Sequence, residues 1–176
     1  CELRLSSPPG DGIVRYRDEV FTSVDKTADL TYGSSVNQSG QTVSLKMDLY
    51  EPVGDTVTTR PVIVLVHGGS FKSGSKTSPE IVDQANVYAK QGFVTASISY
   101  RLSTNGCTVV TGECITATRH ARYDAQAAVR YLRSQAATYG LDSTRIAIAG
   151  TSAGGITALE VAYGSDDVGT SGNPGY

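Results

Sequence analysis

The chain has 176 residues, which is enough to bury one hydrophobic core. Its 15 basic and 17 acidic residues nearly balance, and no basic cluster indicates a nucleic acid or an anionic membrane surface as partner. No apolar stretch approaches the roughly 20 residues that span a bilayer, and the first residues lack the regions of a signal peptide. We therefore expect a globular protein with neither a membrane span nor a nucleic-acid partner.

The first part of the chain predicts antiparallel strands. Residues 1–12 are rich in Ser, Pro and Gly and indicate an extended lead-in. Apolar residues between 20 and 33 predict a first strand, and the polar residues 37–41 predict a turn. Apolar and polar residues then alternate from 43 to 50, the period of a half-buried antiparallel strand.

The middle of the chain predicts a parallel sheet. Residues 62–66 are apolar throughout and suit a strand in the sheet interior. Ser78 followed by Pro79 is typical of a helix start, and apolar residues recur at helical spacing until Gly92. Residues 93–100 predict the next strand, and a strand, helix, strand order implies parallel pairing with a right-handed crossover.

The last part of the chain continues this alternation. A polar insert is predicted from residue 103 to about 118, followed by a helix whose apolar face runs from Ala121 to Ala136. Residues 145–149 predict a buried strand covered on both faces, and residues 156–162 a further helix. Residues 164–176 show no periodicity and predict a loop or a flexible tail.

Two short motifs follow two of the predicted strands. His67-Gly68-Gly69-Ser70-Phe71 comes directly after the apolar run 62–66. Gly150-Thr151-Ser152-Ala153-Gly154 has the G-x-S-x-G pattern, in which glycines permit a sharp strand-to-helix turn that exposes the serine. The following helix directs its free N–H groups and its positive dipole end at the same spot. The sequence therefore indicates a nucleophilic serine, Ser152.

These motifs, with residues 98–102 and 124–132, resemble the N-terminal part of an α/β-hydrolase carboxylesterase or lipase of the hormone-sensitive-lipase or feruloyl-esterase type. The resemblance covers about residues 45–162. It implies a mostly parallel sheet with helices on both faces and antiparallel N-terminal strands, the C-terminal strands being absent. Residues 1–176 would then form the N-terminal part of a single domain.

The resemblance also implies how the site works. Ser152 would attack the carbonyl of a small-molecule or lipid ester, without metal or cofactor. Backbone N–H groups of Gly69, Ser70 and Ala153 would hold the developing oxyanion. Ser70 stands where many members have a third glycine, which a backbone donor tolerates.

The catalytic base is the missing part. In the family order the acid and the histidine follow the nucleophile, yet the chain ends at Tyr176 with no histidine after Ser152. Of the two histidines, His67 is expected to shape its loop and His120 to be a solvated helix-start residue. We therefore interpret the chain as an incomplete hydrolase that a second segment completes.

Cysteine usage favours one local disulfide. Cys107 and Cys114 lie in the same polar segment, and a bond between them favours a secreted or periplasmic setting. Two free thiols are the alternative, because spacing alone does not establish geometry. Cys1 is compatible with a lipidated N-terminus, a bond to a cysteine elsewhere, or a free thiol.

Two other functions compete with the esterase. A serine peptidase on the same fold would share the G-x-S-x-G turn. A non-catalytic binding module could keep the fold without a base. A panel of esters against amides or peptides would distinguish a peptidase from an esterase. Covalent labelling of Ser152 would distinguish an enzyme from a binding module, because only an activated serine should react.

Overall fold

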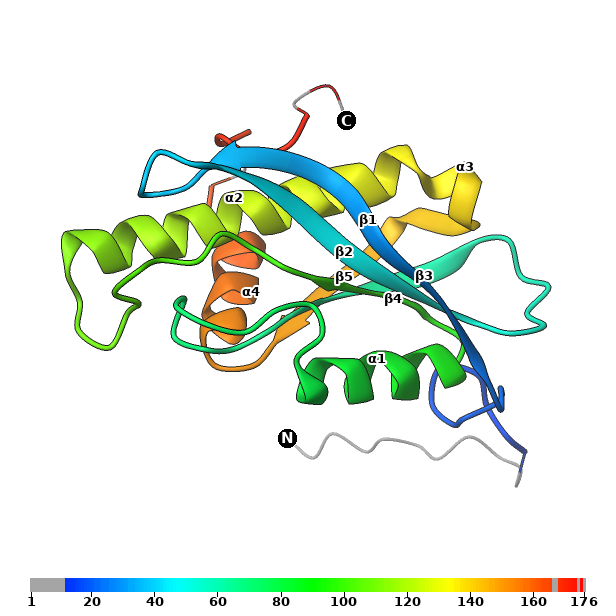
Figure 1. Cartoon of the computed structure of the whole chain (residues 1–176). Helices are drawn as coiled ribbons and strands as arrows, with labels where there is room; N and C mark the ends of the chain where they lie inside the picture. The colour runs from blue at the N-terminus through cyan, green and yellow to red at the C-terminus, as the bar shows by residue number, and fades with distance from the viewer. Residues whose placement is uncertain (1–11, 166–167, 174, 176) are drawn as a thin grey trace, which may run out of the picture.

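A five-stranded mixed sheet lies at the centre of the fold (Figure 1). The computed structural model describes residues 12–165, 168–173 and 175. The strands lie in the order β1-β2-β4-β3-β5. Their bounds are β1 (Val24–Val36), β2 (Thr42–Pro52), β3 (Arg60–Val66), β4 (Val94–Ile98) and β5 (Leu141–Gly150).

The strand directions divide the sheet into two halves. β2 pairs antiparallel with both β1 and β4, whereas β3 pairs parallel with both β4 and β5. The predicted antiparallel N-terminal strands are confirmed. The predicted parallel pairing is found in the other half, so the sheet is mixed.

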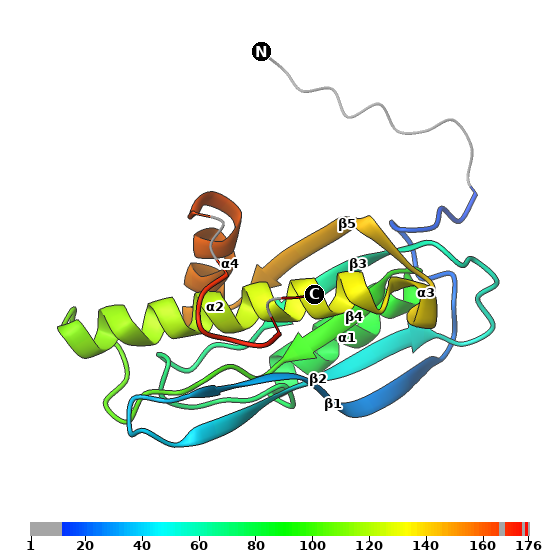
Figure 2. The same cartoon turned by 90° about the horizontal axis from the view of Figure 1, so that it is seen from above.

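Helices cover both faces of the sheet. Helix α1 (Pro79–Lys90) lies on one face, and α2 (Gly112–Ser134) and α4 (Ala153–Tyr163) lie on the other (Figures 1 and 2). The short α3 (Ala136–Tyr139) ends at Gly140, which has φ 59°. The predicted helices on both faces are confirmed.

Each face has its own core. On the α1 side, Ile81, Ala85 and Ala89 pack against Tyr50 and Leu65. On the other side, one face of α2 consists largely of alanines, which are small enough to bring the helix close to the strands. These alanines are Ala117, Ala121, Ala125 and Ala128, and all are at most 1% exposed.

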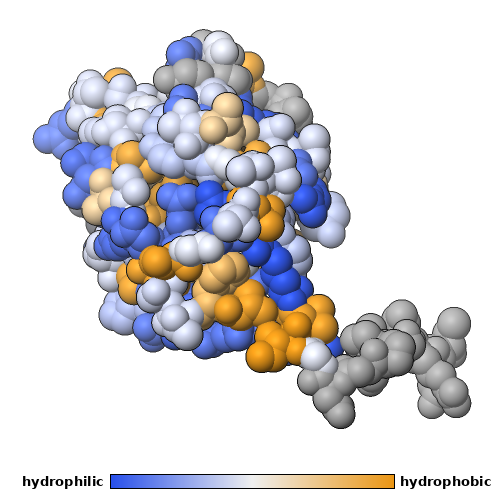
Figure 3. Space-filling view, turned by 90° about the vertical axis from the view of Figure 1, so that its right-hand side faces the viewer, coloured by the Kyte–Doolittle hydropathy of each residue, from blue (hydrophilic) through white to orange (hydrophobic). Residues whose placement is uncertain are grey.

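The first described residues pack against the end of α1. The N–H groups of Tyr16 and Val20 donate to the carbonyls of Gln91 and Lys90, at 2.8 and 2.9 Å. Ile13 and Val14 remain exposed, and Figure 3 shows apolar side chains gathered where the described chain meets the grey segment. The predicted lead-in 1–12 lies outside the described residues apart from Gly12.

Two predictions about individual elements were wrong. The sequence predicts a polar insert up to about residue 118, but α2 already begins at Gly112. The Thr111 Oγ1 accepts a hydrogen bond from the Cys114 N–H at 3.2 Å and caps the helix there. Residues 145–149 were expected to be covered on both faces, but β5 is an edge strand here, and its Ile146 and Ile148 are only partly buried.

A buried ion pair joins the end of the described chain to the sheet. Asp124 on α2 is fully buried and accepts hydrogen bonds from the Arg101 N–H at 2.7 Å and from the Arg101 Nε at 3.0 Å. Ser171, which is 2% exposed, donates to the same carboxylate and accepts from the Arg101 Nη2 at 2.7 Å. The described residues 168–173 therefore lie against α2 and β1, although these residues form no helix or strand.

The buried pair predicts a stability effect at Ser171. Ser171→Ala leaves one oxygen of a buried carboxylate without its hydroxyl donor, so we expect the free energy of unfolding to fall by about 1.5–3 kcal/mol. Thr170→Ala is the matched control, because Thr170 is exposed and its contact to Ser35 uses the backbone carbonyl. Urea unfolding of both variants checks this. Equal stabilities would show that Ser171 adds nothing to the pair.

Candidate functional site

The loops that follow β3 and β5 meet at one edge of the sheet. The two strands are parallel neighbours with Val66 opposite Gly150, so their carboxyl ends lie side by side. The Thr151 N–H donates to the Val66 carbonyl at 3.2 Å and joins the two loops at their starts. The two motifs of the sequence are thereby brought together.

The turn after β5 depends on the absence of side chains. A Cβ atom on Gly154 would lie 2.0 Å from the Val66 carbonyl oxygen, and one on Gly150 would lie 2.5 Å from the Gly154 backbone. No real Cβ fits at either distance. The glycines of the G-x-S-x-G motif therefore let the start of α4 pack directly on the end of β3.

Ser152 lies at the tip of this turn. It is exposed, immediately precedes α4, and has φ 50° and ψ −116°, a strained conformation for a residue other than glycine. The Gly154 N–H is bonded to the Thr151 carbonyl at 2.8 Å, whereas Ala153, as the first residue of α4, has no acceptor within the helix. An exposed hydroxyl thus stands beside a helix N–H that has no backbone acceptor among the described residues.

The loop after β3 lies against the same turn. A Cβ atom on Gly68 would lie 3.4 Å from the Ser152 Cβ. Gly69 has φ 109°, and its carbonyl accepts hydrogen bonds from the N–H groups of Lys72 and Ser73, at 2.9 and 3.1 Å. Ser70 follows with φ 52°, in the left-handed region that favours glycine. This explains why a third glycine suits the position.

His67 is a structural residue of this loop. It is fully buried, and its Nδ1 donates to the Gly68 carbonyl at 2.7 Å. Its ring stacks on Tyr100 with centroids 4.3 Å apart, and the Tyr100 hydroxyl donates to the His67 carbonyl at 3.1 Å. Burial lowers the pKa of the imidazole, which the hydrogen bond to Gly68 opposes. The His67 Nε2 is buried and has no hydrogen-bond partner among the described residues, so the ring makes no hydrogen bond to the Ser152 hydroxyl.

His120 was expected to be a solvated helix-start residue, but it lies well inside α2, which begins at Gly112, and it is partly buried. It borders two hollows that it shares with the β1–β2 turn and the start of α2, among them Asn37, Gln38 and Thr116. Neither hollow is lined by residues of the 67–71 loop or of the turn around Ser152. The two histidines of the chain are thus both unsuited to activate Ser152.

Three residues contact the 67–71 loop in ways that the sequence did not predict. Tyr100 holds the His67 ring and carbonyl, as described above. The N–H groups of Cys107 and Ser103 donate to the carbonyls of Ser70 and Phe71. Tyr100 lies two residues after β4. In space it lies next to the 67–71 loop, which we also call the HGG loop after His67, Gly68 and Gly69, and only the strand order shows this position. The predicted bond between Cys107 and Cys114 is confirmed, and Cys1 falls outside the described residues.

The described residues hold neither a membrane helix nor a metal cluster. None of the helices within them combines the length and the apolar character needed to cross a bilayer. The same residues contain no group of three or more His, Cys, Asp or Glu side chains placed to hold a metal ion.

The fold is that of the α/β-hydrolase esterases. The chain is similar to esterase 2 of Thermogutta terrifontis, with a TM-score of 0.56 and 28% identity over 74% of this chain and 43% of that one. It is also similar to an esterase of Pyrobaculum calidifontis, with a TM-score of 0.54 and 25% identity over 82% of this chain and 39% of that one. A family model described as BD-FAE matches residues 47–173, and the chain belongs to this family.

Curated relatives agree with this class. Carboxylesterase 3B of Mus musculus is 34% identical over 113 residues, which are 64% of this chain and 19% of the relative. Carboxylesterase NlhH of Mycobacterium tuberculosis is 33% identical over 109 residues, 62% of this chain and 31% of the relative. The chain spans between about a fifth and a third of the length of these relatives.

The environment of His120 predicts a pH dependence of stability. Burial, and then the charges of Arg101 and Arg119, lower its pKa from 6.5 to about 4. Between these values the unfolded state takes up a proton that the folded state does not, so the free energy of unfolding falls as the pH is lowered from 6.5 to 4. In His120→Gln this loss should be smaller.

Urea unfolding at pH 7 and pH 4.5 measures the effect. Thr116→Ser, one turn before His120 on α2 and beside the same hollow, is the control and should follow the wild type at both pH values. An equal drop in stability for His120→Gln and the wild type would contradict the prediction.

Proposed function

We propose that this chain carries the nucleophile and the oxyanion hole of a serine carboxylic-ester hydrolase. Ser152 attacks the ester carbonyl, the alcohol leaves, and water then releases the acid from the acyl-enzyme. The observation that carries the proposal is the exposed, strained Ser152 between β5 and α4, in contact with the HGG loop. The similarity to carboxylesterases supports an ester as the substrate, of small-molecule or lipid type.

The oxyanion would be held by backbone groups. The Ala153 N–H lies at the start of α4, where the helix dipole favours negative charge. The N–H groups of Gly69 and Ser70 belong to the loop that touches the Ser152 turn. Such donors stabilise the transition state more than the ground state, because the charge on the oxygen develops only there.

The triad acid and histidine would come from a further segment, on the same polypeptide or on a second one. Neither histidine of this chain suits the role. β5 is an edge strand of the described sheet, and the neighbouring α4 exposes large apolar side chains. These are Ile156, Leu159 and Tyr163, which are 49%, 61% and 86% exposed. A segment that adds strands beyond β5 would cover them, and residues 1–176 would be the N-terminal part of a single domain.

The Cys107–Cys114 disulfide supports an oxidising setting for the protein, either secreted or periplasmic. Disulfides rarely persist where thiols are kept reduced. The proposed reaction fits such a setting because it needs neither a reduced cofactor nor a nucleotide.

Covalent labelling tests the nucleophile. Thermogutta terrifontis esterase 2 has been solved phosphorylated by paraoxon, so paraoxon is the reagent of choice. In the protein at its full natural length we expect one diethylphosphoryl adduct on Ser152, seen by intact mass and peptide mapping. Ser152→Ala should remain unlabelled, and Ser143→Ala, at an exposed position on β5, should react like the wild type.

The outcomes separate the alternatives. No adduct on Ser152 would favour a non-catalytic binding module. An adduct together with hydrolysis of amides rather than esters would favour a peptidase.

A pair of loop variants tests the oxyanion donors. A Cβ on Gly69 would lie 2.2 Å from the Ser73 carbonyl oxygen, so Gly69→Ala must displace the loop. We expect kcat for a short-chain ester to fall about 10²–10³-fold, as for loss of one oxyanion donor. Ser70→Ala keeps the backbone N–H and should retain kcat within about threefold of the wild type. A large loss of kcat in Ser70→Ala would instead assign a role to the hydroxyl.

A further inference from the structure

The segment between β4 and α2 lies directly on the HGG loop. We call residues 103–114 the disulfide segment, because Cys107 and Cys114 are bonded within it. The Cys107 N–H donates to the Ser70 carbonyl at 2.9 Å, and the Ser103 N–H donates to the Phe71 carbonyl at 2.7 Å. Two successive carbonyls of the 67–71 loop are therefore held from outside the loop.

The approach of the two segments is close. Gly106 has φ 71°, and a Cβ atom there would lie 2.9 Å from both the Ser70 carbonyl oxygen and the Lys72 Cβ. A residue with a side chain would push the two backbones apart. Gly106 therefore permits the contact, while the neighbouring Cys107 supplies the hydrogen bond.

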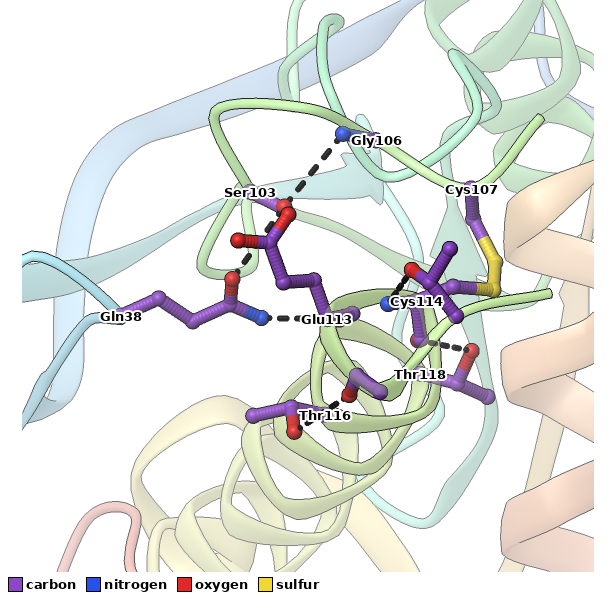
Figure 4. Close-up of a disulfide and its surroundings, with 10 residues drawn as sticks. Gln38, Ser103, Gly106, Cys107, Glu113, Cys114, Thr116 and Thr118 are labelled. Carbon is purple, nitrogen blue, oxygen red and sulfur yellow. Dashed lines mark hydrogen bonds between the residues drawn. A yellow bond between two sulfur atoms is a disulfide. The ribbon is translucent and has the colours of Figure 1, made fainter. Parts of the chain in front are cut away.

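The other end of the disulfide segment is fixed to α2. Cys114 lies in the first turn of the helix, with its N–H bonded to Thr111 Oγ1. Figure 4 shows its disulfide bond to Cys107. The Asn105 side chain donates to the Glu113 carboxylate at 2.6 Å, and the Gln38 side chain donates to the Glu113 carbonyl at 3.0 Å. The disulfide thus connects the contact at Ser70 to a long, well-packed helix.

The middle of the disulfide segment has little packing of its own. Val109 and Val110 are 71% and 81% exposed, so apolar burial does not fix the chain between the two cysteines. The 67–71 loop needs outside support, because Ser70 and Phe71 both lie in the left-handed region, with φ 52° and 58°. Such conformations persist only where the surroundings enforce them.

We propose that the Cys107–Cys114 disulfide positions the oxyanion donors of Gly69 and Ser70. The bond holds Cys107 against the Ser70 carbonyl, and this contact keeps the strained backbone of the loop in place beside Ser152. Cys107 and Cys114 are then positioning residues, acting through the backbone and not touching the substrate. The proposal deepens the proposed function and rests on it.

The test compares the wild type with Cys107→Ser/Cys114→Ser, in the protein at its full natural length. Val109→Ser/Val110→Ser is the matched control, since it alters the same segment but keeps the bond. Two readouts are followed. The first is hydrogen exchange of the Lys72 and Ser73 amides, which donate to the Gly69 carbonyl. The second is phosphorylation of Ser152 by paraoxon, divided into reagent affinity and maximal rate.

In the double cysteine variant we expect exchange of these two amides to rise at least tenfold. The maximal phosphorylation rate should fall about ten- to a hundredfold with reagent affinity unchanged, the pattern of a lost transition-state contact. The valine control should match the wild type in both readouts. Reduction of the folded wild type by a phosphine should reproduce the cysteine variant, which guards against a variant that fails to fold.

Three other results would overturn either this proposal or the proposed function. Exchange and phosphorylation both within twofold of the wild type would overturn the proposal. Exchange that rises equally in β3, α1 and the 67–73 segment would also overturn it, because the bond would then serve general stability. A selective rise in exchange, in a protein whose Ser152 never reacts, would support the positioning but sink the proposed function.

Discussion

The contact between two backbones at the ends of β3 and β5 is the constraint on which the site depends. With Val66 opposite Gly150, the start of α4 lies on the Val66 carbonyl, and Gly68 lies beside Ser152. Parallel strands bring their carboxyl ends to the same edge, but such close approach also requires the absence of side chains. The glycines are therefore as necessary to this geometry as the serine.

The site stores strain that the rest of the fold must sustain. Ser70, Phe71 and Ser152 all have positive φ, at about 1–3 kcal/mol each, so together about 3–9 kcal/mol. This is comparable with the whole stability of a typical domain, about 5–15 kcal/mol. The support is visible around them: Phe71 is 1% exposed and meets Tyr100 edge-on, and Tyr100 in turn stacks on His67. The packed rings of Phe71, Tyr100 and His67 help to hold the strained loop residues in place.

Sequence reasoning found what is local and missed what is assembled from distant segments. The strands, both motifs and the Cys107–Cys114 pair could be predicted, because periodicity and short spacing carry that information. The burial of Arg101 with Asp124 and Ser171 could not, since three segments far apart in the chain meet there. The start of α2 was predicted too late in the chain, because the first turn, which Thr111 caps, consists largely of polar residues without apolar periodicity. The exposure of β5 depends on the number of strands in the sheet, which no local pattern encodes.

The two edges of the described sheet differ in how well they are protected from pairing with a further strand. β1 has irregular pairing with β2, carries Asp25, Lys26 and Asp29, and is joined near Ser34 by the Gly172 N–H at 3.4 Å. Bulges, charges and covering segments are the usual protection of a terminal edge. Residues 146–149 at the end of β5 are apolar and only partly buried or exposed, and β5 ends the described sheet without a further strand beside it. This favours β5 as the edge that accepts another strand. Parallel strands added there would bring their carboxyl ends beside Ser152, which is where the proposed function requires a base that takes the serine proton.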